Sequence, residues 1–207
     1  MLRVLTLATL FPNAARPTVG VFVEWQALAL AARDGVEVEL VAPVGLPAWP
    51  LSLHPRYAAL RRLPRRETWK GLIVHRPRYR VWPLVGARLT ARSMASALLP
   101  LLRGIRTRFP FDVIDAQFFW PDGPAAMRLA EALDVPFSIK ARGSDIYHWG
   151  DRPGIAGEIV EAARRAAGLL AVSGSLRAEM AARGLPDEKI KVHLTGVDLD
   201  SFRPVDR

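Results

Sequence analysis

The sequence predicts an α/β protein with a doubly wound, mostly parallel, Rossmann-like sheet that carries helices on both of its faces. Short, mostly apolar strand segments alternate along the chain with helical segments of roughly ten to twenty residues. The chain has 207 residues, of which 50% are apolar and 24% are charged, a composition typical of globular proteins. A chain of this length buries roughly 70% of its unfolded surface, so it can form a complete hydrophobic core.

The first strand–helix–strand unit shows this pattern most clearly. Residues 2–9 mix β-branched residues with leucine and end before Pro12, which is typical of a buried strand that leads into a loop. Residues 21–33 place apolar side chains on one helical face and are followed by Gly35, which marks the end of a helix. In residues 36–40, valine and leucine alternate with glutamate, as expected for a second strand.

The same alternation continues to the end of the chain. Further strands are expected at residues 72–75, 113–116, 136–141, 169–172 and 190–194. Helices are expected at residues 87–108, 124–133, 155–166 and 175–183. Pro100 should kink or divide the long helix, and Ser175 should cap the last one, which Gly184 ends. No repeat or low-complexity segment interrupts the pattern, so we expect one domain.

Several classes of protein are excluded by composition. Without cysteine there is no disulfide framework, thiolate nucleophile or cysteine-bound metal, and no G-x-S-x-G motif supports a hydrolase. No apolar stretch reaches the roughly 18 residues of a membrane-spanning helix. The apolar start of the chain also resembles a short secretion signal, although its β-branched residues favour a strand. The histidines neither cluster nor show metal-ligand spacing: His54, His75, His148 and His193.

The basic residues are concentrated in one segment. The chain carries a net charge of +9, and residues 56–108 contain fourteen Arg or Lys but a single acid, Glu67. Such an asymmetry indicates a polyanionic partner, either nucleic acid or acidic lipid. A solvated arginine-rich surface without a partner is the alternative.

Ligands of such sheets bind at the carboxyl ends of the strands, so the loops that follow the strands are the candidate sites. The first loop, residues 11–20, leads into a helix N-terminus, where unpaired N–H groups and Gly20 favour a phosphate. It contains no G-x-G-x-x-G and no P-loop lysine. The alternative is that the glycine only permits a tight turn.

The second candidate loop, residues 115–123, contains three consecutive aromatic residues. Phe118, Phe119 and Trp120 are not expected to face one core together, so we expect at least one of them in the cleft, stacked on a sugar ring or lipid. Core packing of all three is the alternative.

The third candidate loop is Arg142-Gly143-Ser144-Asp145, directly after a predicted strand. Arginine recognises phosphate or carboxylate, and aspartate accepts hydroxyl hydrogens or holds the arginine in place. A salt bridge within the loop, without a function, is the alternative. Residues 195–204, the fourth loop, are typical of an exposed turn and linker.

These segments together resemble the N-terminal domain of family 4 glycosyltransferases, which are GT-B enzymes with a nucleotide-sugar donor. The resemblance covers nearly the whole chain and rests on Phe11-Pro12, Gly20-Val21-Phe22-Val23-Glu24, Phe111-Asp112-Val113-Ile114-Asp115-Ala116, Pro121-Asp122-Gly123, Arg142-Gly143-Ser144-Asp145-Ile146, Ala171-Val172-Ser173, Gly196-Val197-Asp198 and Phe202-Arg203-Pro204. The last two are the most specific, because in this family such a segment joins the two Rossmann-like domains.

The resemblance implies a division of labour between two domains. Residues 1–194 would form the acceptor-binding half of a GT-B fold, and residues 195–207 would link it to a C-terminal domain that the chain lacks. Because that domain holds the nucleotide-sugar in relatives, we expect this fragment to be inactive alone. The complete enzyme would be a hexosyltransferase that retains anomeric configuration, with the nucleotide-sugar as co-substrate and no cofactor or required metal.

The resemblance also assigns roles to residues of the loops. Arg142 stands where relatives often have histidine. Because arginine keeps its proton at neutral pH, it would act electrostatically beside Asp145 rather than as a base. The expected catalytic residues are Arg142 and Asp145, the expected donor-phosphate contacts are Thr18, Val19 and Gly20, and the expected acceptor contacts are Gln117, Phe118, Trp120 and Ser144.

The basic segment interleaves arginine with aromatic residues, a combination that favours a membrane interface. Membrane-associated relatives with lipid-linked acceptors carry such a patch, so we expect peripheral docking on the inner face of the cytoplasmic membrane, with a glycolipid or polysaccharide acceptor. The expected docking residues are Arg61, Arg62, Arg65, Arg66, Trp69, Arg78, Arg80 and Trp82.

Two other functions stay open from the sequence. A nucleic-acid-binding module would explain the charge, but no helix-turn-helix, RNP or zinc-finger motif is present, so we expect no nucleic acid partner. A sugar- or nucleotide-binding domain without catalysis is the second alternative.

Overall fold

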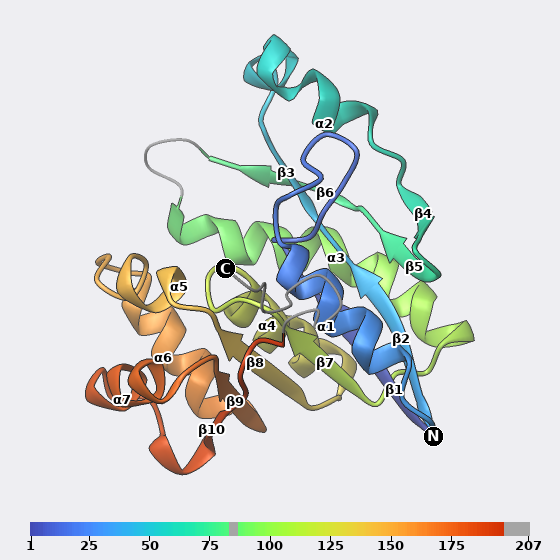
Figure 1. The fold of residues 1–207 in the computed structure, drawn as a ribbon. Helices are drawn as coiled ribbons and strands as arrows, with labels where there is room; N and C mark the ends of the chain where they lie inside the picture. The colour runs from blue at the N-terminus through green and yellow to red at the C-terminus, as the bar shows by residue number, and fades with distance from the viewer. Residues whose placement is uncertain (83–86, 197–207) are drawn as a thin grey trace, which may run out of the picture.

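A computed structural model describes residues 1–82 and 87–196 and shows an eight-stranded sheet in the order β10-β9-β8-β7-β1-β2-β5-β4 (Figure 1). Its neighbouring strands pair in parallel, except that β4 is antiparallel to β5. The strands are β1 (Leu2–Leu7), β2 (Val36–Val41), β4 (Arg66–Trp69), β5 (Leu72–His75), β7 (Val113–Ala116), β8 (Phe137–Ala141), β9 (Gly168–Ala171) and β10 (Ile190–Val192). The predicted fold class is therefore confirmed.

The strand order reverses its direction at β1. The chain proceeds from β1 to β2 and β5 on one side, and later from β7 to β8, β9 and β10 on the other. The loops that leave the carboxyl ends of β1 and β7 therefore diverge, and this is where doubly wound sheets form their ligand crevice.

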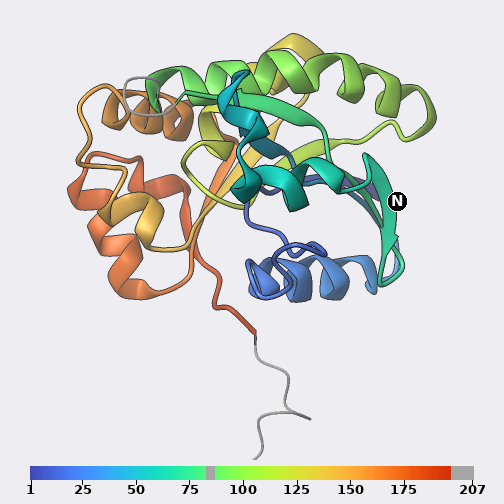
Figure 2. The same cartoon turned by 90° about the horizontal axis from the view of Figure 1, so that it is seen from above.

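Helices cover both faces of the sheet (Figure 2). α1 (Val21–Ala31) packs on one face next to β2, and α3 (Ala87–Arg108), α4 (Asp122–Leu133) and α6 (Ala156–Arg165) pack together on the other. α7 (Gly174–Ala182) contacts β9 and β10. The largest apolar core lies under α3, α4 and α6, a smaller one lies under α1, and a third, of Val44, Leu60 and Leu63, lies outside these two.

α3 is a single helix of 22 residues despite Pro100, so the prediction that this proline divides the helix is wrong. Pro100 is exposed and lies on the face opposite the buried positions, which follow helical spacing. The helix therefore loses one solvent-side hydrogen bond while its core contacts continue past the proline. These buried side chains are Ala91, Met94, Ala95, Leu98, Leu102 and Ile105.

Residues 44–81, in and just before the basic segment, contain elements that the sequence pattern did not predict. β3 (Val44–Pro47) and β6 (Arg78–Val81) form a separate two-stranded parallel ribbon, which packs against α3. The short helices η1 (Leu51–Leu53), η2 (Pro55–Tyr57) and α2 (Ala58–Arg62) follow β3. Four-residue strands that contain glycine, proline or alternating arginine carry too weak a pattern to be recognised. A residue with a Cβ at Gly45 would approach the Tyr79 hydroxyl to 3.0 Å, so the glycine brings the two strands together.

Two further differences concern the end of the chain. Ser173, not Ser175, caps α7: its Oγ accepts a hydrogen bond of 3.1 Å from the Leu176 N–H. The last strand ends at Val192 rather than at residue 194.

The structure also contains two short helices that the sequence did not predict, α5 (Ser144–Tyr147) and η3 (Asp187–Lys189). Most of the expected linker, residues 197–207, lies outside the described residues.

Candidate functional site

The loops after β1, β7 and β8 meet at the carboxyl edge of the sheet. The Gln117 N–H donates to the Leu7 carbonyl at 2.9 Å, and the Thr9 N–H donates to the Asp122 carboxylate at 3.0 Å. The Phe119 N–H donates to the Asp145 carboxylate at 2.9 Å. The second and third loops that the sequence singled out are therefore joined by hydrogen bonds to each other and to the segment just before the first loop.

Asp145 holds two of these loops together. Its side chain is completely buried and accepts hydrogen bonds from the backbone N–H groups of Phe119, Arg142 and Gly143, at 2.9, 3.0 and 2.8 Å. Burial raises the pKa of the carboxyl group, and the backbone N–H groups oppose that rise. Since both oxygens are bound to backbone, Asp145 fits a positioning role better than the catalytic contact that the sequence predicted.

Arg142 extends from the same loop toward the first turn of α1. Its Nε donates to the Gln117 carbonyl at 2.9 Å, and an Nη donates to the side-chain oxygen of Gln26 at 3.2 Å. The guanidinium lies over the Phe22 ring, 4.7 Å from the ring centre. Within the described residues no carboxylate forms an ion pair with Arg142. The alternative of a salt bridge within this loop is therefore not observed.

Burial lowers the pKa of Arg142 to about 10, against the attraction of Asp115, Asp145 and Asp122. The guanidinium therefore keeps its proton at neutral pH and presents a fixed positive charge beside the helix N-terminus. One of these acids, Asp115, is buried. Burial raises the pKa of the Asp115 carboxyl group, whereas the hydrogen bonds that Ser138 and Gln117 donate to it oppose that rise.

Lys140 is a second buried cation of the site, which the sequence analysis missed. Its ammonium group donates to the Gln26 side chain at 2.7 Å and lies 2.7 Å from Nδ1 of His193. Burial and the neighbouring Arg142 lower its pKa to about 8. A lysine in the middle of an apolar strand was the available signal, because a buried lysine needs polar partners.

Gly20 precedes the first turn of α1 in the left-handed conformation, with φ of 76°. A Cβ there would lie 2.3 Å from the Leu10 carbonyl oxygen, so the close approach of two backbone segments requires glycine. Thr18 and Val19 are exposed on the same loop. The turn interpretation of Gly20 therefore has a steric basis, and the loop presents the helix N-terminus next to Arg142.

The prediction that an aromatic side chain of the second loop lines the cleft is wrong. Phe118, Phe119 and Trp120 expose 7, 0 and 2% of their surface, and the Trp120 ring packs 6.2 Å from that of Trp149. α4 begins at Asp122, two residues earlier than predicted, and the Gly123 N–H closes a turn onto the carbonyls of the first two aromatics. This turn directs all three rings into the protein.

Two other expected acceptor contacts have opposite exposures. Gln117 is buried, and its side chain bonds to Arg142 and Asp115. Ser144 is exposed at the start of α5, so it is the one residue of the expected acceptor set that a ligand can reach directly.

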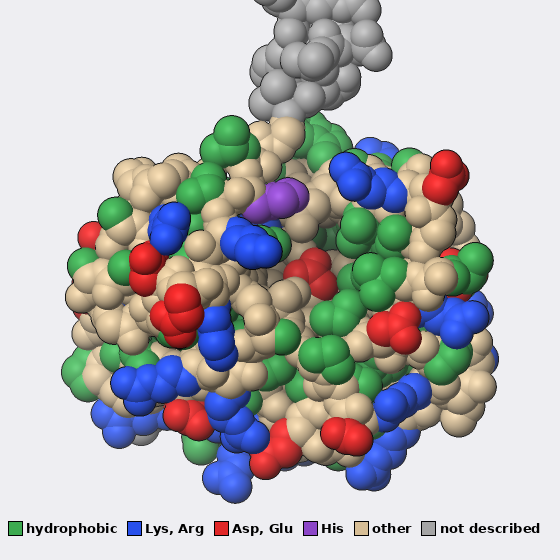
Figure 3. Space-filling view, turned by 90° about the horizontal axis from the view of Figure 1, so that it is seen from below, with side chains coloured by type: hydrophobic (Ala, Val, Ile, Leu, Met, Phe, Trp, Pro, Cys, Tyr) green, Lys and Arg blue, Asp and Glu red, His purple; other side chains and the backbone are tan. Residues whose placement is uncertain are grey.

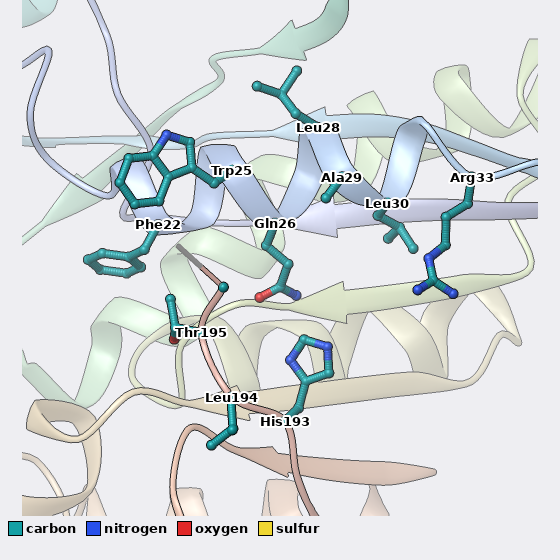
Figure 4. Close-up of a pocket in the computed structure, with 11 residues that line it drawn as sticks. Phe22, Trp25, Gln26, Leu28, Ala29, Leu30, Arg33, His193, Leu194 and Thr195 are labelled. Atoms are coloured by element: carbon teal, nitrogen blue, oxygen red, sulfur yellow. The ribbon is translucent and has the colours of Figure 1, made fainter. Parts of the chain in front are cut away.

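A cavity of about 810 Å³ lies between α1 and the segment that follows β10 (Figure 4). Phe22, Trp25 and Gln26 of α1 face His193 and Thr195 across it. Gln26 and His193 are both bonded to Lys140, so the polar wall of the cavity is continuous with the buried cations of the site.

The expected docking residues separate into exposed and structural ones. Arg61, Arg62, Arg65, Arg66 and Arg80 are exposed, as is Trp82. Trp69 is half-buried and packs against the smaller apolar core, with its indole N–H bonded to Glu24 and its ring edge-on against Phe11. The expectation that Trp69 faces a membrane is therefore wrong. Arg78 is also half-buried, with its guanidinium bonded to backbone carbonyls.

The part of the basic segment that forms α2, β4 and β6 lies toward the top of Figure 1, whereas α3, the rest of the segment, crosses the molecule below it. The opposite end, seen from below in Figure 3, shows basic and acidic side chains intermixed with hydrophobic ones. In residues 1–82 and 87–196, no group of three or more His, Asp or Glu side chains is placed to hold a metal ion. None of the helices in these two ranges is long and apolar enough to cross a membrane.

The doubly wound sheet and its switch-point crevice define the chain as a Rossmann-like half of a GT-B fold. Solved structures share this fold at low identity. HepE of Anabaena in complex with UDP and glucose matches with a TM-score of 0.55 and 16% sequence identity. The match covers 97% of this chain and 46% of the HepE chain. The UDP-GlcNAc 2-epimerase of Methanocaldococcus jannaschii matches with a TM-score of 0.52 and 12% sequence identity. The match covers 93% of this chain and 45% of the epimerase chain.

The family is shown by sequence comparison. The Glycosyltransferase Family 4 model matches residues 19–201, and the chain belongs to this family as an N-terminal domain. It is 30% identical over 209 residues to a protein of Bacillus subtilis (strain 168) assigned as the teichuronic acid biosynthesis glycosyltransferase TuaC, covering 98% of this chain and 51% of the relative. The chain thus spans about half the length of this relative.

Proposed function

We propose that this domain supplies the acceptor side and part of the donor-phosphate site of a hexosyltransferase. The enzyme would move a sugar from a nucleotide-sugar to a lipid-linked or polysaccharide acceptor of the cell envelope, with retention of anomeric configuration. One observation carries the proposal: the charged Arg142 guanidinium lies against Phe22, in the first turn of α1 and two residues after Gly20.

This arrangement suits the charge that develops during glycosyl transfer. The departing nucleotide diphosphate gains negative charge, which a helix N-terminus and a fixed guanidinium stabilise. Gly20 lets the loop pack tightly against Leu10 and so places the N-terminus of α1 at the site, with exposed Thr18 and Val19 beside it. Lys140 adds a second positive charge behind Gln26.

The acidic residues of the site support a mechanism without a protein nucleophile. The Asp145 carboxylate is occupied by three backbone N–H groups, and Asp115 and Asp122 are buried. With these carboxylates out of reach, we propose that the acceptor hydroxyl attacks on the face from which the diphosphate departs. Exposed Ser144 is the acceptor contact that we retain.

The complete enzyme needs a second domain for the donor. HepE, which shares the fold, was solved with UDP and glucose, and this chain covers 46% of it. We propose that a C-terminal half holds most of the nucleotide-sugar, that residues 195–207 lead to it, and that the 207-residue chain is inactive alone. In this proposal, the transfer requires no cofactor and no metal.

The exposed arginines around α2 support peripheral docking on the inner face of the cytoplasmic membrane. Each arginine near an anionic surface contributes about 1 kcal/mol, so several together hold a domain at the bilayer. Co-sedimentation with anionic and neutral vesicles at low salt tests this proposal, and equal binding to both would contradict it. A gel-shift with duplex DNA should show no steep salt dependence, since we propose no nucleic acid partner.

The catalytic proposal is tested with the complete gene product and a panel of nucleotide-sugars. Turnover with an α-configured product from an α-configured donor, followed by NMR of the anomeric proton, is the expected result. Nucleotide-sugar binding without turnover on any acceptor would instead favour a non-catalytic sugar-binding domain.

A further inference from the structure

A second concave site lies away from the switch-point crevice, between the β3–β6 ribbon and α3. This groove has a volume of about 600 Å³. The polar side chains that line it come from the segment after β3 and from α2, β6 and α3, and include Trp49, Arg61, Arg78, Arg80, Ser93 and Ser96.

The three arginines of the groove lack acidic partners. Arg61 donates to the Ser52 carbonyl, and Arg78 donates to the carbonyls of Arg76 and Leu63, so both guanidinium groups are fixed by backbone. Among the described residues, no carboxylate lies within ion-pair distance of Arg61, Arg78 or Arg80. Three positive charges around one groove, two of them held in place by backbone carbonyls, favour an anionic ligand.

Hydroxyl groups complete the polar lining. Tyr79 is 8% exposed, its ring belongs to the core and it lines the groove, yet its hydroxyl has no hydrogen-bond partner in the described part of the chain. Ser93 and Ser96 of α3 add two further hydroxyls. The Tyr79 hydroxyl is therefore free to donate a hydrogen bond to a phosphate oxygen in the groove.

One rim of the groove is apolar and exposed. Trp49 exposes 78% of its surface, and Leu51 and Leu53 expose 58 and 57%. Ser52, between the two leucines, lines the groove, so both leucines lie at its rim. Exposed leucines do not recognise sugars or free ions, and three large apolar side chains on one short segment favour contact with hydrocarbon.

We propose that this groove binds the phosphate of a membrane-anchored lipid phosphomonoester, with Trp49, Leu51 and Leu53 inserted into the bilayer beside it. A phosphomonoester brings close to two negative charges to the three guanidinium groups, whereas the phosphodiester of a common anionic lipid brings one. The inference rests on the proposed membrane docking and specifies the lipid that the docked surface selects.

The test uses vesicles of phosphatidylcholine that contain either phosphatidic acid, a phosphomonoester, or phosphatidylglycerol, a phosphodiester, adjusted to equal surface potential. We expect the 207-residue chain to bind the phosphatidic acid vesicles about tenfold more tightly. Arg80→Gln should abolish this preference. Arg62→Gln removes the same charge from exposed α2 outside the groove, so it should weaken binding to both vesicles by the same factor, about fivefold.

The outcomes separate the headgroup site from docking in general. Equal binding of the unmodified chain to both anionic vesicles would overturn the headgroup site and leave docking intact, and binding to neither would overturn both. Displacement from the vesicles by excess inorganic phosphate would show a site for the free ion and would also overturn the proposal. Trp49→Ala provides a second variant, which should lose vesicle binding while a thermal melt shows that it stays folded.

Discussion

Asp145→Asn tests the claim that a buried carboxylate organises the site. The carboxylate accepts backbone N–H groups of Phe119, Arg142 and Gly143 at 2.8–3.0 Å. An asparagine can direct its oxygen toward Arg142 and Gly143, but its NH₂ group then faces the Phe119 N–H. One buried donor is left without an acceptor, which costs about 1–3 kcal/mol.

The two remaining hydrogen bonds also lose the charge of their acceptor, which costs about 0.5 kcal/mol each. Burial raises the pKa of Asp145, which means that the charged carboxylate is costly to bury. Its replacement by a neutral amide therefore offsets part of this loss. The net decrease in the free energy of unfolding is therefore about 2 kcal/mol, measured by urea denaturation at neutral pH.

Ser144→Ala is the matched control for this variant, because Ser144 is the exposed neighbour of Asp145 and its loss should change stability by less than about 0.5 kcal/mol. Hydrogen exchange adds a local readout, since the Phe119 amide should exchange faster in Asp145→Asn. An Asp145→Asn protein as stable as the control, with an unchanged Phe119 amide, would refute the reasoning.

Three further predictions concern Gly20, Asp122 and the Trp69–Glu24 contact. Gly20→Ala should lower the free energy of unfolding by about 2 kcal/mol or more, because the added Cβ meets the Leu10 carbonyl at 2.3 Å; Gly157→Ala, with open space around it, is the control. Burial raises the pKa of Asp122 from 3.8 to about 7, so the folded state holds its proton longer than the unfolded state and stability falls as pH rises through that window. Asp122→Asn should remove this loss of about 4 kcal/mol in urea titrations at several pH values. Trp69→Phe should be destabilised in thermal melts by about 1 kcal/mol, because buried Glu24 loses its indole donor, while vesicle binding stays unchanged.

Each of these predictions has an outcome that contradicts it. A Gly20→Ala protein no less stable than Gly157→Ala would mean that the loop shifts without cost. Parallel pH profiles for Asp122→Asn and the unmodified chain would mean that Asp122 titrates normally in the fold. A loss of vesicle binding in Trp69→Phe would restore this tryptophan to the docking surface.

The strands and helices could be predicted where one physical signal dominates. Residues 72–75 and 113–116 were recovered as strands because short apolar runs stand between glycine, proline or acidic turns. The β3–β6 ribbon was not predicted, because Gly45 and Pro47 indicate a turn when the partner strand is unknown. Its pairing joins segments far apart in the sequence, and no local pattern reports that.

The loops of the site could be located from the sequence, but their contacts could not. The rule that ligands bind at carboxyl ends of parallel strands placed Arg142 and Gly20 at one edge of the sheet. It did not say which side chains face inward, so Trp120 was expected to be open and Asp145 to be reactive. Whether a carboxylate binds substrate or backbone depends on neighbouring loops, which only the tertiary structure brings together.

The central claim is that the Arg142 guanidinium beside the first turn of α1 stabilises the departing diphosphate. The most direct measurement is kcat/KM of the complete gene product and its Arg142→Met and Arg142→Lys variants, with Arg164→Met on the exposed surface of α6 as the control. Loss of one fixed positive group at developing charge should lower kcat/KM by about 100- to 1,000-fold in Arg142→Met, with partial recovery in Arg142→Lys. Equal rates for Arg142→Met and the control would contradict the account.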